Sequence, residues 1–178
     1  MKALALIFEG FEEEEAVAPF ALFRRAGGDL TICSNYKTVK GSHGLTLANI
    51  ELLANIDYKS FDCLIIPGGA HYKYLMESEL VHEIICYFFD NNKIVCGICA
   101  APTVFGALGY LKGKNYTCFT AMNKEFGGFY QNDGVVVDNN LITAKSVAYS
   151  LDFAYAIIEK TLGKDTLDWV LDKIYYEK

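Results

Sequence analysis

Short apolar runs alternate with longer amphipathic segments along the chain. Most of these runs are continuous rather than alternating with polar residues, which is typical of strands buried on both faces of a parallel sheet. Residues 41–44, with two glycines in a polar stretch, predict a hairpin or turn. The runs that predict strands are 2–8, 29–33, 61–66, 93–98, 116–119, 134–137 and 141–144.

The segments between these runs carry helix signals. Residues 12–26 have acidic side chains in the first turn and arginines in the last, as the helix dipole favours, and glycines follow. The alternation of strands and helices predicts an α/β fold, with a mostly parallel sheet and helices on both faces. Because no repeat or linker interrupts it, we expect a single domain over residues 1–178. The other segments that predict helices are 78–91, 100–109, 150–162 and 165–173.

Composition narrows the possible functions. Hydrophobic residues make up 52% of the chain and charged residues 21%, an ordinary balance for a soluble protein. The net charge of −6, with scattered Lys and Arg, disfavours nucleic acid and anionic membranes as partners. No apolar run reaches the ~20 residues that span a bilayer, and no export signal is visible. We therefore expect a cytoplasmic protein with six reduced cysteines.

One cysteine stands where a predicted strand gives way to a helix. The apolar run 94–98 ends at Cys99, small residues follow, and Pro102 suits a first helical turn. This is the pattern of a nucleophile elbow, a sharp turn that exposes its central side chain at the carboxyl end of a sheet. We expect the helix N-terminus to lower the pKa of the Cys99 thiol. The alternative is a buried structural cysteine at a strand end.

Cys96 and Cys99 also form a C-x-x-C pair, which allows a redox dithiol or half of a zinc site. No second pair and no histidine stands at zinc-finger spacing, which argues against structural zinc. Cys96 falls within the strand, where we expect its side chain to point into the core, so dithiol chemistry is the lesser alternative. We predict no metal and no cofactor.

A glycine pair closes another predicted strand. Gly68 and Gly69 follow the apolar run 61–66 and Pro67. Consecutive glycines at a strand end let backbone N–H groups approach a ligand, and parallel strands bring such loops to one edge of the sheet. The N–H groups of Gly69 and Ala100 could thus form an oxyanion hole beside the elbow cysteine. Taken alone, the glycines would indicate only a turn.

Among the four consecutive acids 12–15, Glu15 differs in its surroundings. It precedes an apolar segment and stands one turn before Pro19, which cannot donate to its carbonyl, so we expect the helix to be disturbed there. A carboxyl group at an apolar site has a raised pKa and, when protonated, donates a hydrogen bond to a thiolate. We expect the other three acids to be solvated.

The histidines give no sign of a Cys–His triad. Ala100 follows Cys99 directly, where a histidine partner would be expected. His71 comes just after the glycine pair and is near enough to line a pocket, although a loop histidine is more often simply exposed. His43 follows a glycine turn, and His82 falls on a predicted exposed helix face.

Three segments, in this order, resemble the ThiJ/PfpI family of the class I glutamine amidotransferase-like superfamily. Within that family the sequence is most similar to the branch of Parkinson disease protein 7 and YajL. The resemblance covers nearly the whole chain and implies a flavodoxin-like three-layer sandwich and a homodimer. The matching segments are 11–15 leading to 24–27, 64–69, and 98–103.

The resemblance also implies roles for individual residues. Cys99 matches the nucleophilic, redox-sensitive cysteine, and Glu15 matches the protonated glutamate beside it. Gly69 and Ala100 match the oxyanion-hole donors. The candidates for the pocket lining are Gly68 and His71, from their place in the loop, and Arg25 and His43, from the resemblance.

Two positions depart from family patterns. Ala100 stands where the protease-like branch has a histidine, which counts against peptidase activity. Phe119 stands where the branch of Parkinson disease protein 7 has a histidine on a later strand, which counts against a histidine-assisted mechanism.

Three functions remain open at this point. The first is glyoxalase- or deglycase-like action on a small reactive carbonyl or glycated substrate, through a Cys99 thiolate. The second is a redox sensor or redox-regulated chaperone of the oxidative-stress response, which works through Cys99 oxidation. The third is a cysteine hydrolase or amidotransferase relative, or a protein of thiazole monophosphate biosynthesis. The resemblance specifies the family and leaves open whether the protein is an enzyme.

Overall fold

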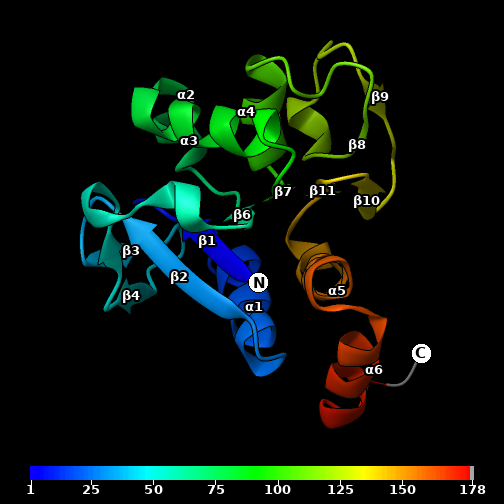
Figure 1. Ribbon diagram of the computed structural model, residues 1–178. Coiled ribbons are helices and arrows are strands. Elements are labelled where there is room, and N and C mark those ends of the chain that lie inside the picture. The colour runs from blue at the N-terminus through cyan, green and yellow to red at the C-terminus, as the bar shows by residue number, and fades with distance from the viewer. Residues whose placement is uncertain (177–178) are drawn as a thin grey trace.

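The computed structural model describes residues 1–176 and is built around one seven-stranded sheet (Figure 1). The strand order is β10-β11-β7-β6-β1-β2-β5, and every pairing is parallel except that of β10 with β11. The strands of this sheet are β1 (Lys2–Leu6), β2 (Asp29–Ser34), β5 (Glu51–Leu52), β6 (Cys63–Ile66), β7 (Ile94–Ile98), β10 (Val135–Asp138) and β11 (Leu141–Ala144).

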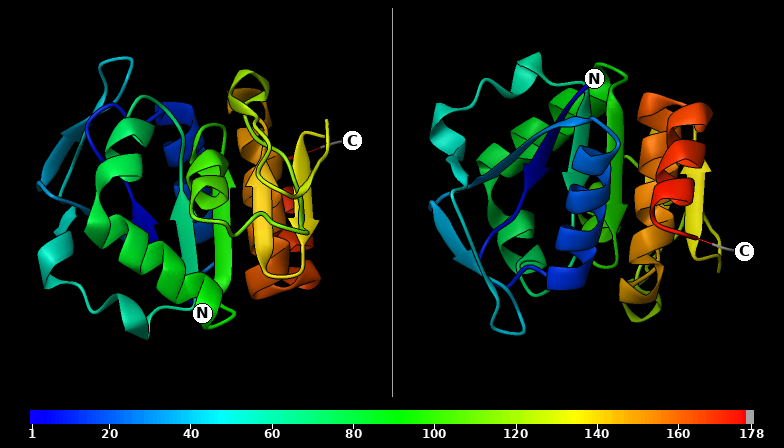
Figure 2. Two further views of the ribbon diagram at one scale, coloured as in Figure 1. Left: turned by 90° about the horizontal axis from the view of Figure 1, so that it is seen from above. Right: turned by 90° about the horizontal axis from the view of Figure 1, so that it is seen from below.

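Helices cover both faces of the sheet. On one face lie α1, α5 and α6, and on the other lie α2, α3 and α4 (Figures 1 and 2). This is the flavodoxin-like three-layer arrangement, so the predicted fold class is confirmed. The helices are α1 (Glu13–Arg25), α2 (Tyr72–Glu77), α3 (Glu79–Asp90), α4 (Ala101–Ala107), α5 (Ser150–Leu162) and α6 (Lys164–Lys173).

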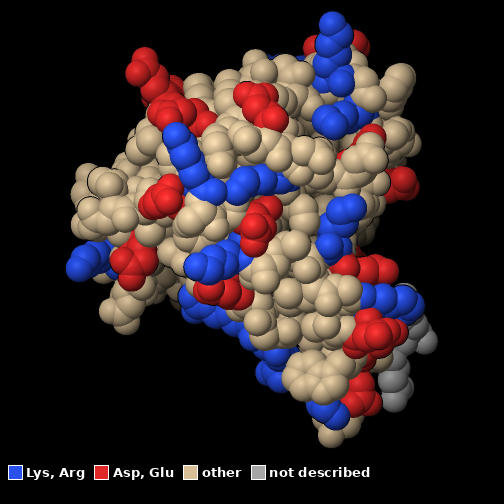
Figure 3. All heavy atoms as spheres, in the orientation of Figure 1, with Lys and Arg blue, Asp and Glu red and all other residues tan. Residues whose placement is uncertain are grey.

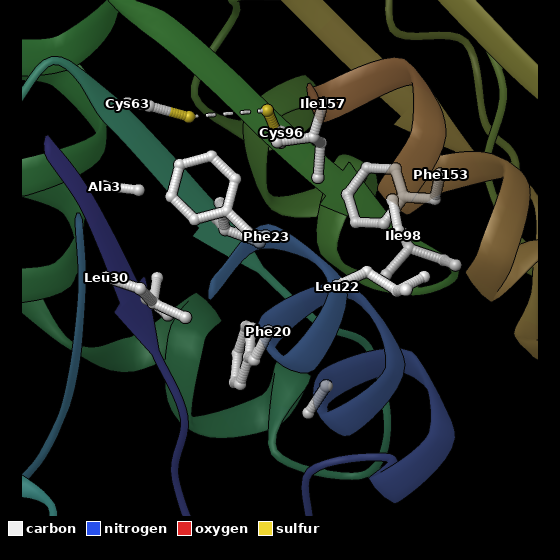
Figure 4. Close-up of a cluster of buried hydrophobic side chains, with 14 of the residues drawn as sticks. Ala3, Phe20, Leu22, Phe23, Leu30, Cys63, Cys96, Ile98, Phe153 and Ile157 are labelled. Carbon is white, nitrogen blue, oxygen red and sulfur yellow. Dashed lines mark hydrogen bonds between the residues drawn. The ribbon is translucent and has the colours of Figure 1, made fainter. Parts of the chain in front are cut away.

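Each central strand contributes to two hydrophobic cores because alternate side chains point to opposite faces. In β1, Ala3 and Ala5 face the α1 and α5 layer, whereas Leu4 and Leu6 face the α3 and α4 layer. Figure 4 shows the first core, where aromatic rings such as Phe23 of α1 lie over the small side chains of β1. The continuous apolar runs in the sequence therefore reflect burial on both faces.

Two small sheets lie outside the main one. The predicted turn at 41–44 is the tip of an antiparallel hairpin of β3 (Thr38–Lys40) and β4 (Thr46–Ala48). The predicted strand at 116–119 is shorter than expected: β8 (Asn115–Tyr116) pairs with β9 (Phe129–Tyr130). Strand β8 ends at Tyr116 because the backbone groups that follow it form hydrogen bonds with residues outside β9. The N–H of Thr117 donates to the Thr143 side chain at 2.9 Å.

Helix α1 runs without a break through Pro19, contrary to the disturbance expected from the sequence. The Pro19 ring is buried within the helix, and the N–H of Ala16, one turn earlier, still donates to the Glu12 carbonyl at 3.1 Å. Burial of one face of α1 against the sheet outweighs the loss of one helical hydrogen bond.

The carboxyl ends of β1, β6 and β7 meet at one edge of the sheet, where the loops that follow them lie side by side. A bridge between Phe11 and Gly69 joins the first two of these loops. In α/β sheets, sites are built at this edge. On the face shown in Figure 3, acidic and basic side chains are interspersed. Among residues 1–176, no helix is long and apolar enough to cross a membrane.

Candidate active site

Cys99 lies at the junction of β7 and α4, and its backbone has a φ of 62°, in the left-handed region. This conformation costs a non-glycine residue about 1 kcal/mol or more, so its surroundings must impose it. The Cys99 N–H donates to the Ala144 carbonyl at 2.8 Å, and its carbonyl accepts the Phe119 N–H at 2.8 Å. The half-buried thiol therefore sits on a strained turn that β11 and the segment after β8 hold in place.

Glu15, in the first turn of α1, is buried with 1% of its surface exposed. One carboxyl oxygen, Oε2, accepts the Gly68 N–H at 2.9 Å, and the carboxyl group and the Cys99 side chain both lie against the position that a Gly68 Cβ atom would occupy. Burial raises the pKa of Glu15 to about 7, although the contacts with Cys99 and Gly68 oppose the rise. Glu15 thus populates both protonation states near neutral pH, in contact with the sulfur.

Gly68 allows Glu15 and Cys99 to approach each other. A Cβ atom at this position would lie 2.5 Å from Glu15 Oε2, 2.7 Å from Cys99 Cβ and 3.0 Å from the Ala100 nitrogen. The Gly68 carbonyl accepts the Glu12 N–H at 2.9 Å, which ties the loop to the start of α1. Only glycine leaves space for all of these contacts.

Two backbone N–H groups near the thiol have no carbonyl or side-chain oxygen partner within residues 1–176. They are those of Gly69, whose φ of 100° suits glycine, and of Ala100, which donates toward the Cys99 sulfur. Both belong to loops at the same sheet edge. Their free hydrogen-bonding capacity is what an oxyanion hole requires.

The pKa of the Cys99 thiol is raised, contrary to the lowering expected from its place at a helix start. Burial raises it most, and the charge and hydrogen bond of Glu15 raise it further, whereas the Ala100 N–H lowers it. Helix α4 has seven residues, too short for a strong dipole. Near neutral pH the thiol therefore keeps its proton while Glu15 is partly ionised, so the ionised Glu15 is placed to take the thiol proton as Cys99 attacks.

His71 is buried, which excludes the exposed loop position that the sequence left open, and it does not line an open pocket. Its Nδ1 accepts the Phe8 N–H at 3.2 Å, so its Nε2 donates to the Pro67 carbonyl at 2.8 Å. This neutral ring joins the loop after β1 to the loop that carries Gly68. His71 is a positioning residue, and its partner Phe8 is too distant in the sequence to be foreseen.

Arg25 and His43 do not lie beside the thiol pair as the resemblance implied. Arg25 is ten residues beyond Glu15 on α1, about 15 Å along the helix, at the opposite edge of the sheet, near Trp169. His43 is exposed at the tip of the β3–β4 hairpin, with its Nε2 3.1 Å from Glu12 Oε2. The Arg25 prediction is therefore wrong, and His43 contacts the start of α1 rather than Cys99.

Cys96 is fully buried, as expected from its place in the strand. Its Sγ lies 3.8 Å from the Sγ of Cys63 on the neighbouring strand β6, shown as a dashed line in Figure 4. The nearest thiol partner of Cys96 is thus a core residue, and the C-x-x-C spacing does not form a dithiol site with Cys99.

Among the six thiols, Cys99 is expected to react first with limiting hydrogen peroxide. Four of the others are buried, so peroxide reaches their sulfur atoms less readily than that of the half-buried Cys99, and the Glu15 carboxylate beside Cys99 can accept its proton. Peptide mass spectrometry should place the first added oxygens on Cys99. Cys86, the one other half-buried cysteine, is the internal comparison. Faster modification of Cys86 would contradict the elbow assignment.

Glu15 and His71 are expected to make opposite contributions to the pH dependence of stability. Burial lowers the pKa of His71 to about 4, so stability falls as pH drops below the ordinary histidine value of 6.5. Glu15 has a folded pKa of about 7, above its ordinary 4.5, so its contribution is complete at low pH and is lost as pH rises through 7. Between pH 5 and 7 each residue changes the free energy of unfolding by about 2 kcal/mol, and the two changes nearly cancel because they have opposite signs.

Urea unfolding of single variants at pH 5 and 7 should separate the contribution of Glu15 to stability from that of His71. Relative to the wild type, Glu15→Gln should gain about 2 kcal/mol in stability between pH 5 and 7, and His71→Gln should lose about as much. Glu14→Gln, which changes an exposed neighbour, should follow the wild type. Parallel curves for all four proteins would contradict the buried ionisations.

The sequence and the fold of this chain have counterparts among known proteins. The sequence profile of the DJ-1/PfpI family matches residues 1–160. The crystal structure of Drosophila melanogaster DJ-1beta is similar with a TM-score of 0.92 and 29% identity, covering 99% of this chain and 98% of that chain. The chain therefore belongs to the DJ-1/PfpI family, the family that its three sequence segments indicate.

Relatives within the family carry several names. A protein named deglycase TK1284, from Thermococcus kodakarensis, is 29% identical over 150 residues, 82% of this chain and 90% of its own length. The glutathione-independent glyoxalase DJR-1.2 of Caenorhabditis elegans is 29% identical over 174 residues, 96% and 93% of the two chains. Protein DJ-1 homolog B of Arabidopsis thaliana is 35% identical over 167 residues, and the chain spans 38% of that longer protein.

Proposed function

We propose that the protein is a cysteine-dependent enzyme that acts on small reactive carbonyls, in the manner of a glyoxalase or deglycase. The contact between Cys99 and Glu15 carries the proposal, because it joins a nucleophile to a group that can take and return a proton. Two relatives that align with this chain over most of their own length are named a deglycase and a glyoxalase. These names support small reactive carbonyls as the substrate class.

The first step is addition of the thiol to an aldehyde such as that of methylglyoxal. Cys99 Sγ forms a bond to the aldehyde carbon, the C=O π bond breaks, and Glu15 takes the thiol proton and passes it to the new oxygen. The N–H groups of Gly69 and Ala100 stabilise the charge on that oxygen while it develops. The product of this step is a hemithioacetal.

The later steps need a single proton carrier. Glu15 removes the proton from the former aldehyde carbon and returns it to the adjacent ketone carbon, while the hydroxyl proton on the former aldehyde carbon moves to the former ketone oxygen. These two transfers convert the hemithioacetal into a thioester of lactate. Water then cleaves the C–S bond, so methylglyoxal and water give lactate and a proton, with no external oxidant or reductant. A carboxyl group with a pKa of about 7 suits a proton carrier, since near neutral pH it accepts a proton and donates one with similar ease.

The site favours this chemistry over the two alternatives. A redox sensor has no need of a proton carrier beside its thiol, whereas carbonyl isomerisation does, and the Glu15 carboxyl group lies next to the Cys99 side chain. A hydrolase of the Cys–His type requires an imidazole partner, and within residues 1–176 none of His43, His71 and His82 hydrogen-bonds Cys99. The homodimer implied by the family resemblance remains a prediction.

A substrate panel tests the proposal. The intact, reduced protein is incubated with methylglyoxal, glyoxal and a methylglyoxal-glycated thiol, and substrate loss and hydroxyacid formation are followed by chromatography. Turnover of at least one of these compounds is expected. Oxidation of Cys99 by peroxide with no consumption of any carbonyl would overturn the proposal in favour of the sensor.

A further inference from the structure

A second group of chemically active side chains lies beside the Cys99–Glu15 pair and takes no part in the proposed reaction. It consists of Glu12 and Glu13 at the start of α1 and His43 on the β3–β4 hairpin. One ligand atom from each, two carboxylate oxygens and an imidazole nitrogen, lie within 4.8 Å of one another. Three donors at this spacing can reach a single metal ion.

Glu13 is the member that a metal ion would explain best. The sequence predicted a solvated side chain, yet only 4% of Glu13 is exposed. Its Oε1 accepts the N–H groups of His43 at 2.8 Å and Leu45 at 3.2 Å. Its Oε2 is buried and has no hydrogen-bond partner among the described residues. A buried carboxylate oxygen without a partner is costly, and metal coordination is one of the usual ways to satisfy it.

The hairpin that carries His43 is fixed against the start of α1. The Ser42 N–H donates to the Phe11 carbonyl at 2.8 Å, and Ser42 Oγ donates to the Gly10 carbonyl at 2.7 Å. Gly41 packs so closely on the Glu13 carboxylate that a Cβ atom there would overlap it. The histidine and the two acids are thus brought together by backbone contacts that do not depend on their own side chains.

We propose that Glu12, Glu13 and His43 bind one divalent transition-metal ion of the zinc class. An imidazole with two carboxylates is a ligand set that suits zinc, cobalt or nickel better than magnesium or calcium, which take oxygen ligands alone. Three protein ligands leave a coordination position for water. The imidazole is mostly exposed, so an ion can enter from solvent. An ion pair between His43 and Glu12 alone would leave the buried Glu13 oxygen unexplained.

Calorimetric titration of the reduced, chelator-treated protein with zinc chloride tests this site. We expect one equivalent to bind, with affinity at least tenfold weaker in His43→Ala and in Glu12→Gln. Glu14→Gln changes an exposed acid that follows Glu13 on α1 and should bind like the wild type. Circular dichroism should show that His43→Ala and Glu12→Gln remain folded, since both side chains are at least partly exposed.

Cysteines offer zinc a competing site, so two further measurements identify the ligands. Cys99→Ser should retain zinc binding, and the cobalt complex of the wild type should lack the intense sulfur-to-metal charge-transfer absorption of thiolate ligands. Undiminished binding in His43→Ala and Glu12→Gln, or loss of binding in Cys99→Ser, would overturn the proposal. Because these measurements use no carbonyl substrate, they succeed or fail independently of the proposed enzyme activity.

Discussion

Alanine at position 68 is expected to remove most carbonyl turnover while leaving a folded protein. The added Cβ would overlap Glu15 Oε2 and Cys99 Cβ, at 2.5 and 2.7 Å, so these two side chains must move apart. Overpacking of this kind costs about 1–3 kcal/mol in stability. Displacing a proton carrier from its nucleophile by about 1 Å lowers turnover on the order of 100-fold.

The measurement is methylglyoxal consumption, with urea unfolding of the same samples. Gly27→Ala is the matched control, because Gly27 lies beyond the far end of α1 and has open space around its Cβ position. Its φ of 83° predicts a loss of about 1 kcal/mol in stability without a loss of turnover. Equal turnover in Gly68→Ala and Gly27→Ala would show that close contact between Glu15 and Cys99 is not needed.

Replacing Glu15 by glutamine should separate thiol reactivity from turnover. The amide can still accept the Gly68 N–H and donate toward the sulfur, but it cannot carry a proton. We expect turnover to fall by about 10²–10⁴-fold. Since the charge of Glu15 raises the pKa of Cys99, its removal should also make the thiol react faster with iodoacetamide near neutral pH.

Rates of alkylation and of methylglyoxal consumption, each measured across pH 5–9, would show both effects. Glu14→Gln, an exposed neighbour in the same turn of α1, should leave both rates unchanged. Intact turnover in Glu15→Gln would mean that another group moves the proton.

Local sequence patterns predicted Cys99 and Glu15 because each position is defined by its immediate neighbours. The elbow needs only a strand, a small-residue junction and a helix start, all of which are contiguous around Cys99. Glu15 stands out because an apolar segment follows it. In both cases the neighbouring residues in the sequence indicate the environment that the structure shows, which is buried for Glu15 and strained for Cys99.

Such local patterns could not predict contacts between segments that are distant in the sequence. The His71 ring binds the Phe8 N–H across 63 positions, and Glu13 is buried by a hairpin about 30 positions away. Arg25 shows a different error. A helix that begins at the carboxyl edge of a parallel sheet must end at the opposite edge, so a residue in its last turn cannot line a site at its first. Helix direction alone would have excluded it.

The raised pKa of Cys99 is also a property of the assembled site. A helix start lowers the pKa of an exposed thiol, but here burial and a carboxyl group from another element have the larger effects. Neither is visible in the sequence around Cys99. The consequence is functional, since a thiol that shares its proton with Glu15 is activated during attack rather than before it.

The most direct test of the account is the rate of lactate formation from methylglyoxal by Cys99→Ser and Cys86→Ser. Cys86 is the other half-buried cysteine and lies on α3, away from the glycine loop. We expect no lactate above the uncatalysed rate from Cys99→Ser, because its hydroxyl is a far weaker nucleophile, and wild-type rates from Cys86→Ser. Lactate formation by Cys99→Ser at a rate near that of the wild type would contradict the assignment of Cys99 as the nucleophile.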